Sequence, residues 1–148
     1  MRELLIFPMI ALLIGAFIPV QASMNAVLSK SWGNVYYPTL FLFSVALLCI
    51  GILVVAKGIK PPELSVAISA PPYGYFAGLI LGSNILLITY LAPRMGMGNA
   101  IFFVVTGQIV AAVLIDHFAL LGAIKTPLSW QRICGIVLMV FGLGLARS

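Results

Sequence analysis

Charged residues are scarce in this sequence. Only 7% of its 148 residues are Asp, Glu, Lys or Arg, against roughly 25% in soluble domains. Long uncharged runs cover residues 4–29, 31–56, 64–93 and 95–115, and a helix needs about 20 apolar residues to cross a bilayer. A soluble fold is excluded because it needs a polar surface that this composition does not supply. The sequence therefore predicts an all-α integral membrane protein.

Acidic residues are the scarcest charged type, with three against eight basic ones. The basic residues are scattered without a cluster, which excludes the basic patch of a nucleic-acid-binding protein. They resemble the Lys and Arg that flank membrane spans and fix their orientation. We therefore expect the lipid bilayer, and no nucleic acid, as a partner.

Cysteine is limited to Cys49 and Cys134, each alone in an apolar segment. This spacing excludes a disulfide scaffold and a cysteine metal site, so both are interpreted as buried small apolar residues. The sequence also lacks a Ser/His/Asp set, a metal-ligand cluster, a Gly-rich phosphate loop and a haem ligand pair. We expect no enzymatic activity, no cofactor and no bound metal.

The uncharged runs predict one transmembrane domain over residues 1–148 with five spans, at about 5–28, 38–56, 73–92, 98–120 and 128–147. A polar turn from Ser29 to Asn34 separates the first two. Residues 64–70 lie between two Pro-Pro pairs and are too short to span, so they are expected at the membrane interface. The fifth span is the weakest, and it reaches spanning length only if Arg132 extends to the headgroups.

The first span has an alternative interpretation. Arg2, the apolar run Leu4–Val20 and the small residues near Ala22 resemble a secretory signal peptide. Glu3 and Pro8 do not suit such a peptide, and the apolar character continues to Leu28. These features favour a retained span, with a cleaved leader as the alternative.

Three residues of the first span predict a polar cavity. Pro19 has no amide hydrogen, so we expect a break in the helix that leaves the Gly15 carbonyl without its helical partner. Gln21 and Asn25 are four residues apart and share one face of the helix. Polar groups in hydrocarbon must be satisfied by protein, water or cargo. Hydrogen bonding between helices is the alternative role for the two carboxamides.

Further polar residues lie in the third and fourth spans. The predicted substrate-binding set adds to Gln21 and Asn25 the residues Asn84, Tyr90, Thr106 and Gln108. Asp116 and His117 are the only acid and the only histidine in the spans, and an ionisable residue within a membrane is a candidate functional group. They are candidates for charge or proton coupling. The alternative is a helix end that the pair caps in the interface.

Glycines recur at helical spacing in two spans. Gly74, Gly78 and Gly82 form a stripe of small residues that predicts close packing within the chain. Gly135 and Gly142 lie two turns apart in the fifth span, where we expect a contact between subunits, with packing within the chain as the alternative.

Several motifs together resemble a known family. The segment Gly15-Ala16-Phe17-Ile18-Pro19-Val20-Gln21, with Asn25-Ala26, is similar to the first helix of the YdcZ-type family. Leu91-Ala92-Pro93-Arg94-Met95-Gly96, and Gly107-Gln108 followed by Asp116-His117-Phe118, resemble its third and fourth helices. These small five-span bacterial proteins belong to the drug/metabolite transporter (DMT) superfamily. The resemblance implies a transporter that occurs singly, in pairs or as a fused double, and it names no cargo.

An odd number of spans places the two chain ends on opposite sides of the membrane. Transporters often combine two halves of opposite orientation, so an unfused half must obtain its partner by dimerisation. Five basic residues lie on the N-terminal side (Arg2, Lys57, Lys60, Lys125, Arg132) and three on the other (Lys30, Arg94, Arg147). This weak bias permits both orientations and predicts an antiparallel homodimer. The alternative is one orientation with a paralogous half-transporter as the partner.

These features together predict a half-transporter in the bacterial cytoplasmic (inner) membrane. As a dimer it would move a small metabolite or drug-like solute by alternating access. Two alternatives stay open: a non-transporting accessory subunit of a larger membrane complex, and a passive channel.

Overall fold

The structure is a computed structural model that describes residues 2–145, with side chains described for 5–142, 144 and 145. Its elements are α1 (Arg2–Trp32), α2 (Tyr36–Ala56), α3 (Leu64–Ser69), the 3-10 helix η1 (Pro72–Phe76), α4 (Ala77–Met95), α5 (Met97–Phe118), the 3-10 helix η2 (Leu120–Gly122) and α6 (Trp130–Leu145). Every regular element of the described residues is helical. The predicted all-α class is confirmed.

Among the described residues, four segments are long and apolar enough to cross a membrane: Leu5–Trp32, Tyr36–Ala56, Pro72–Met95 and Met97–Phe118. A 21-residue helix such as α2 is about 31 Å long, which matches a hydrocarbon core of about 30 Å. The apolar part of α6 is shorter, Trp130–Gly142. Four predicted spans are thus confirmed as helices of spanning length. The fifth stays a prediction as a span, and its predicted end at 147 lies outside the described residues.

The first helix ends later than the sequence predicts. The Ser31 hydroxyl donates to the Val27 carbonyl at 3.0 Å, so it bonds to its own helix instead of forming a turn. Gly33, at φ +71°, stops the helix in the left-handed region that glycine tolerates best. The Asn34 side-chain oxygen then accepts the amides of Tyr36 and Tyr37 at 3.0 and 2.9 Å and caps α2. The polar turn is therefore shorter than predicted.

Pro19 lies inside α1, as does Pro8, and the helix continues through both. A proline removes one amide donor and so weakens one turn. The helix is thus continuous through Pro19, and the predicted break at the Gly15 carbonyl stays a prediction.

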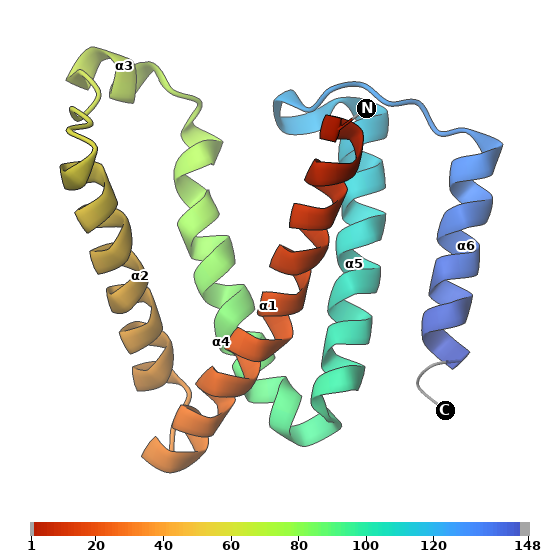
Figure 1. Cartoon of the computed structure of the whole chain (residues 1–148), viewed down its shortest axis with the longest axis horizontal. Coiled ribbons are helices and arrows are strands. Elements are labelled where there is room, and N and C mark those ends of the chain that lie inside the picture. Colours follow the sequence, from red (N-terminus) through yellow and green to blue (C-terminus); the bar gives the residue numbers. More distant parts are fainter. Residues whose placement is uncertain (1, 146–148) are drawn as a thin grey trace. The chain divides into compact units, whose positions relative to one another are not determined.

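The chain divides after Arg94 into two units. In the first unit, α1 and α4 come together near the end where α1 leads into α2, and α2 and α4 diverge toward the other end (Figure 1). Ala22, Pro38, Ile88 and Ala92 are buried there. Three of these side chains are small, which allows helix backbones to approach closely.

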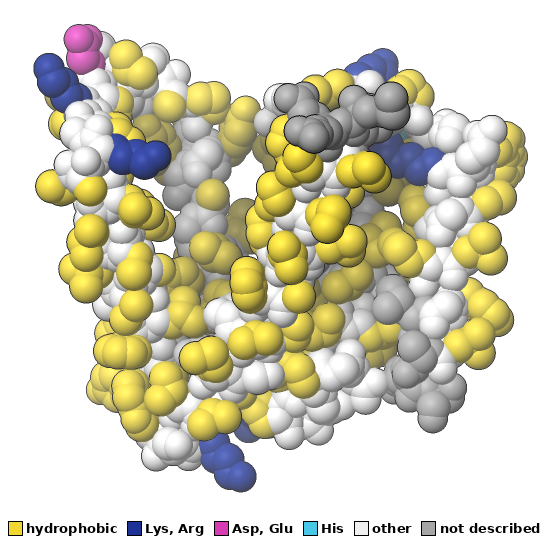
Figure 2. Space-filling view, in the orientation of Figure 1, with side chains coloured by type: hydrophobic (Ala, Val, Ile, Leu, Met, Phe, Trp, Pro, Cys, Tyr) yellow, Lys and Arg dark blue, Asp and Glu magenta, His cyan; other side chains and the backbone are white. Residues whose placement is uncertain are grey.

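Most apolar side chains of the spans are exposed. Leu12, Leu47 and Val55 are 75, 73 and 80% exposed. On the face that Figure 2 shows, hydrophobic side chains cover the helices, and basic side chains lie near the helix ends. Such a surface requires lipid or another protein around it. The expectation that Cys49 and Cys134 are buried is wrong, because both are exposed on these apolar helices.

The glycine stripe of the third span does not form as predicted. Gly74 lies in η1, so only Gly78 and Gly82 belong to the α-helix. A Cβ atom placed on any of the three meets no other atom within 4 Å. The expected close packing within the chain is therefore not seen at these positions.

In the second unit, α5 ends at Phe118 because the backbone turns left-handed directly after it. Ala119, Leu121 and Gly122 have φ values of +51°, +56° and +81°. The Ser129 hydroxyl accepts the amide of Arg132 at 3.2 Å and caps the start of α6. The fourth span thus ends two residues before its predicted limit, and the fifth begins two residues after.

Candidate functional site

Asn25 of α1 is the centre of a buried polar cluster in the first unit. Its amide nitrogen donates to the Thr89 hydroxyl of α4 at 2.7 Å and to the Thr39 hydroxyl of α2 at 3.3 Å. Asn25, Thr39 and Thr89 are 2, 4 and 1% exposed. One carboxamide therefore connects three helices, and the alternative role of hydrogen bonding between helices applies to its nitrogen.

The hydrogen bonds fix the orientation of this carboxamide. The Thr39 hydroxyl donates its single hydrogen to the Val35 carbonyl at 2.8 Å, so it can only accept from Asn25. The –NH₂ group of Asn25 must therefore face the two threonines, and a flipped amide would leave oxygen against oxygen at Thr39. The Asn25 side-chain oxygen is consequently turned away from both hydroxyls.

Two buried polar atoms of α1 have no hydrogen-bond partner among the described residues: the Asn25 side-chain oxygen and the Gln21 side-chain nitrogen. The residues share one face of α1, about 6 Å apart along its axis. A buried polar group without a partner costs roughly 1–3 kcal/mol. This face offers one unused acceptor and one unused donor, and we call it the Gln21–Asn25 site.

The other predicted residues of the first unit are outside this cluster. Asn84 and Tyr90 are exposed on α4. The Arg94 guanidinium lies 3.5 Å from the centre of the Tyr90 ring and donates to the Tyr90 carbonyl at 2.6 Å. The α4 residue that contacts Asn25 is Thr89, the immediate neighbour of Tyr90. Substrate binding by Asn84 and Tyr90 stays a prediction.

The two predicted residues of α5 belong to the second unit. The Thr106 hydroxyl donates to the Phe102 carbonyl of its own helix at 2.8 Å, and Gln108 is exposed. Their role in substrate binding also stays a prediction.

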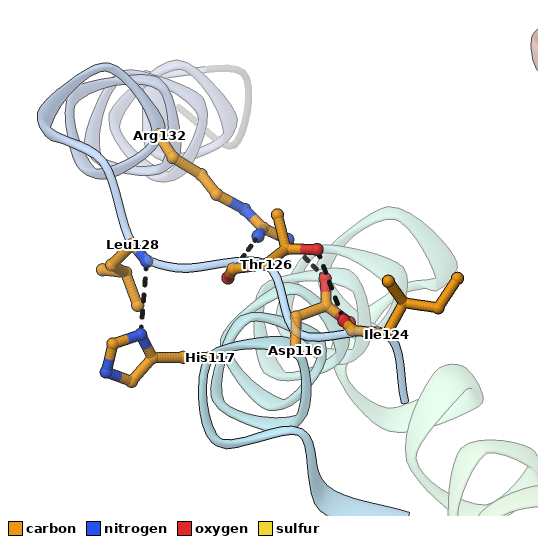
Figure 3. Close-up of polar contacts among 6 residues, drawn as sticks. All are labelled: Asp116, His117, Ile124, Thr126, Leu128 and Arg132. Carbon is orange, nitrogen blue, oxygen red and sulfur yellow. Dashed lines mark hydrogen bonds and ion pairs between the residues drawn. The ribbon is translucent and has the colours of Figure 1, made fainter. Parts of the chain in front are cut away.

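Asp116 and His117 lie in the last turn of α5, where they connect it to α6 and the segment before it (Figure 3). The Asp116 carboxylate accepts from the Arg132 guanidinium at 2.6 Å, with both side chains about a third exposed. The Arg132 guanidinium also donates to the Thr126 carbonyl at 3.4 Å. The predicted extension of Arg132 to the headgroups stays a prediction.

His117 takes part in the same junction through its ring. Its Nδ1 atom accepts the amide hydrogen of Leu128 at 3.2 Å, which places the proton of the neutral ring on Nε2. The backbone carbonyl of Asp116 accepts the amide of Thr126 at 3.0 Å. This junction matches the interfacial helix end that was the alternative to coupling, and a coupling role for the two residues stays a prediction.

An apolar groove of about 710 Å³ lies along one face of α2, lined by Ser44, Leu47, Leu48, Gly51, Ile52, Val55 and Ala56. The Ser44 hydroxyl already donates to the Leu40 carbonyl at 2.9 Å. The groove therefore lacks free polar groups with which to recognise a solute, in contrast to the Gln21–Asn25 site.

Comparison with known proteins places the chain in a family. The family model described as "Putative inner membrane exporter, YdcZ" matches residues 6–145. The chain belongs to the YdcZ family. No curated protein and no solved structure matches it. The YdcZ resemblance drawn from the helix motifs is confirmed, and the chain is a multi-pass protein of the inner membrane.

Three contacts of this YdcZ-family chain were not predicted from its sequence: Asn25–Thr39, Asn25–Thr89 and Asp116–Arg132. Thr39 and Thr89 are short, common side chains whose pairing with Asn25 depends on how the helices cross. A partial signal existed for Thr39, because Asn25 and Thr39 flank a short turn between two antiparallel helices. The sequence gives a clearer indication of the Asp116–Arg132 pair. Asp116 lies near the end of the fourth span and Arg132 near the start of the fifth, so the two side chains can meet across the segment that connects these spans.

Proposed function

We propose that this YdcZ-family chain is one half of a solute exporter and that its cargo binds at the Gln21–Asn25 site. The observation that carries the proposal is the pair of buried, unpartnered polar atoms on one face of α1. A cargo that satisfies both atoms offsets the cost of burying them. The site can therefore bind a solute although none of its own groups carries a charge.

The Asn25 nitrogen gives the site its rigidity. Because it is held by Thr39 and Thr89, the carboxamide oxygen keeps one direction and needs little reorganisation when cargo arrives. Gln21 has a longer and less constrained side chain. In the proposed mechanism, Gln21 adjusts to the cargo and Asn25 sets its position.

A second half of opposite orientation would complete the transporter. Two inverted halves can alternate between two equivalent tilted states, so that a site near the midplane opens first to one side and then to the other. Gly135 and Gly142 lie two turns apart on α6, and small residues at this spacing allow a second helix to approach closely, which supports a subunit contact. A second copy is the proposed partner, with a paralogous half as the alternative.

Asp116 and Arg132 have a structural role in this proposal. Their ion pair neutralises two charges at the junction of α5 and α6, which lowers the cost of placing the short α6 helix in the membrane. Recognition of cargo is assigned to the neutral groups of the first unit. We propose neither catalysis nor a cofactor for this chain.

Solutes released by living cells provide the test. Cells expressing the wild-type chain, Gln21→Leu or Ser44→Ala would be compared by mass spectrometry of their media. We expect at least one solute to be enriched by the wild type and by Ser44→Ala, but not by Gln21→Leu. A strain with the empty vector is the control. The proposal would be contradicted if the solutes in the medium were the same for this control and for all three expressing strains.

A further inference from the structure

The two unpartnered atoms differ in what they require. The Asn25 oxygen is an acceptor and needs an N–H or O–H group. In the orientation that the structure gives the Gln21 carboxamide, its buried nitrogen is a donor and needs a lone pair. A carboxylate has no hydrogen to give, and an ammonium group has no lone pair to offer. A primary amide carries both a donor and an acceptor on one carbon, so it is complementary to both atoms.

The surroundings of the site also select against charge. The buried side chains near Asn25 are those of Ala22, Thr39, Ile88 and Thr89, all of them neutral. An ion buried without an opposite charge is strongly unfavourable in such surroundings. The small apolar neighbours suit the hydrocarbon part of a solute.

Among the described basic side chains of the first unit, none forms a hydrogen bond with Gln21 or Asn25, and Lys57 and Lys60 follow the end of α2 opposite to Thr39. Lys30 is exposed in the last turn of α1. Arg94 is held at the end of α4 against Tyr90. Within the described residues of the first unit, an anionic solute at the Gln21–Asn25 site would therefore be buried against neutral groups.

We propose that the Gln21–Asn25 site selects uncharged solutes whose polar group carries both a hydrogen-bond donor and an acceptor, with the primary amide as the simplest form. This inference rests on the proposed function for its biological meaning. The binding itself does not depend on transport and can be measured separately.

Four probes, each with a phenyl ring and a different polar group, test which class of polar group the site prefers. Benzamide has donor and acceptor, acetophenone replaces the –NH₂ group with a methyl group, benzoate is an anion, and benzamidinium is a cation. Thermal unfolding of the full-length chain in detergent would be followed while each probe is titrated. Because a ligand that binds only the native state stabilises it, benzamide should raise the unfolding temperature in a saturable way. The other three probes should bind about tenfold more weakly or worse.

Variants assign the binding to the site. Gln21→Leu should weaken benzamide binding about tenfold, because one hydrogen bond is lost. Its unfolding temperature without probe should stay near the wild-type value, since the Gln21 nitrogen has no partner to lose. Ser44→Ala removes a hydroxyl that bonds its own helix and should bind benzamide as the wild type does.

Several results would overturn the inference. Equal shifts with all four probes would show non-selective hydrophobic binding. Tighter binding of benzoate or benzamidinium would show the wrong charge class. No shift with benzamide up to its solubility limit, or an unchanged benzamide affinity in Gln21→Leu, would also reject the site as described.

The inference and the proposed function can fail separately. Selective benzamide binding that depends on Gln21, without export of any solute, would leave the site assigned and reject the exporter. Export that depends on Gln21 but carries a charged solute would support the exporter and overturn the inference about substrate class.

Discussion

The amide nitrogen of Asn25 lies 2.7 Å from the hydroxyl of Thr89, a residue 64 positions later in the chain. The same nitrogen lies 3.3 Å from the Thr39 hydroxyl. Both contacts are buried, so each should contribute to the stability of the first unit. The shorter distance implies that Thr89 contributes more than Thr39.

The two threonines can be compared directly. Thr89→Val should lower the free energy of unfolding by about 1 kcal/mol, because the buried Asn25 amide loses its better acceptor. Thr39→Val should cost less, and the near-equal size of Val and Thr keeps packing effects small. Reversible unfolding in mixed micelles with increasing SDS would measure both values. A larger loss for Thr39→Val would contradict the arrangement around Asn25.

The ion pair between Asp116 and Arg132 should be detectable by a double-mutant cycle. Asp116→Asn and Arg132→Gln should each destabilise the chain, with a coupling energy of roughly 0.5–1 kcal/mol because the pair is partly exposed. The coupling should fall as salt is added. A coupling energy of zero would reject the pair.

The same variants test the coupling role predicted from the sequence. If the ion pair only joins α5 to α6, transport by Asp116→Asn and by His117→Gln should keep the wild-type dependence on pH. A stable Asp116→Asn protein that has lost this dependence would show instead that Asp116 carries a proton during transport.

Orientation in the membrane follows from the weak basic bias between the two sides. Lys30 and Lys60 lie near opposite ends of α2 and are both exposed, so single cysteines at positions 30 and 60 report on opposite membrane faces. The native Cys49 and Cys134 are exposed as well and must first be replaced by Ala. A membrane-impermeant thiol reagent should label both positions in intact cells. Labelling of one position only would contradict dual topology and favour a paralogous partner.

The α6 helix should form the subunit contact. Gly142→Leu places a large side chain where close backbone approach is expected, and it should shift the protein from dimer to monomer in detergent. Light scattering coupled to gel filtration would measure the mass, with Gly15→Leu on α1, another open glycine, as the control. An unchanged dimer would exclude Gly142 and direct attention to the apolar groove along α2.

The long uncharged runs predict the helices well, because the length and apolar character of a span are local properties of the sequence. The start of α2 and the end of α4 were placed within a few residues, and the errors came from capping. Ser31 bonds back into its helix, and Ala119 takes a left-handed conformation. Both depend on the fine geometry of a helix end, which composition does not specify.

The candidate site was only partly predictable. Gln21 and Asn25 could be placed on one face from their spacing alone. The Asn25 nitrogen has hydrogen-bond partners in Thr39 and Thr89, whereas the Asn25 oxygen has none among the described residues. This difference could not be predicted, because the positions of the two threonines depend on how the helices cross. Tyr90 is exposed, and the contact with Asn25 belongs to Thr89, because adjacent residues on a helix point about 100° apart.

Liposomes containing only this chain test the central claim most directly. They would be loaded with the low-molecular-weight solutes of the host cells, and the solutes that leave would be identified by mass spectrometry. The wild type and Ser44→Ala should release a small set of uncharged solutes at rates that saturate with concentration, and Gln21→Leu should release them about tenfold more slowly. Release that matches empty liposomes, or that is equal in Gln21→Leu and the wild type, would contradict a transporter that works through the Gln21–Asn25 site.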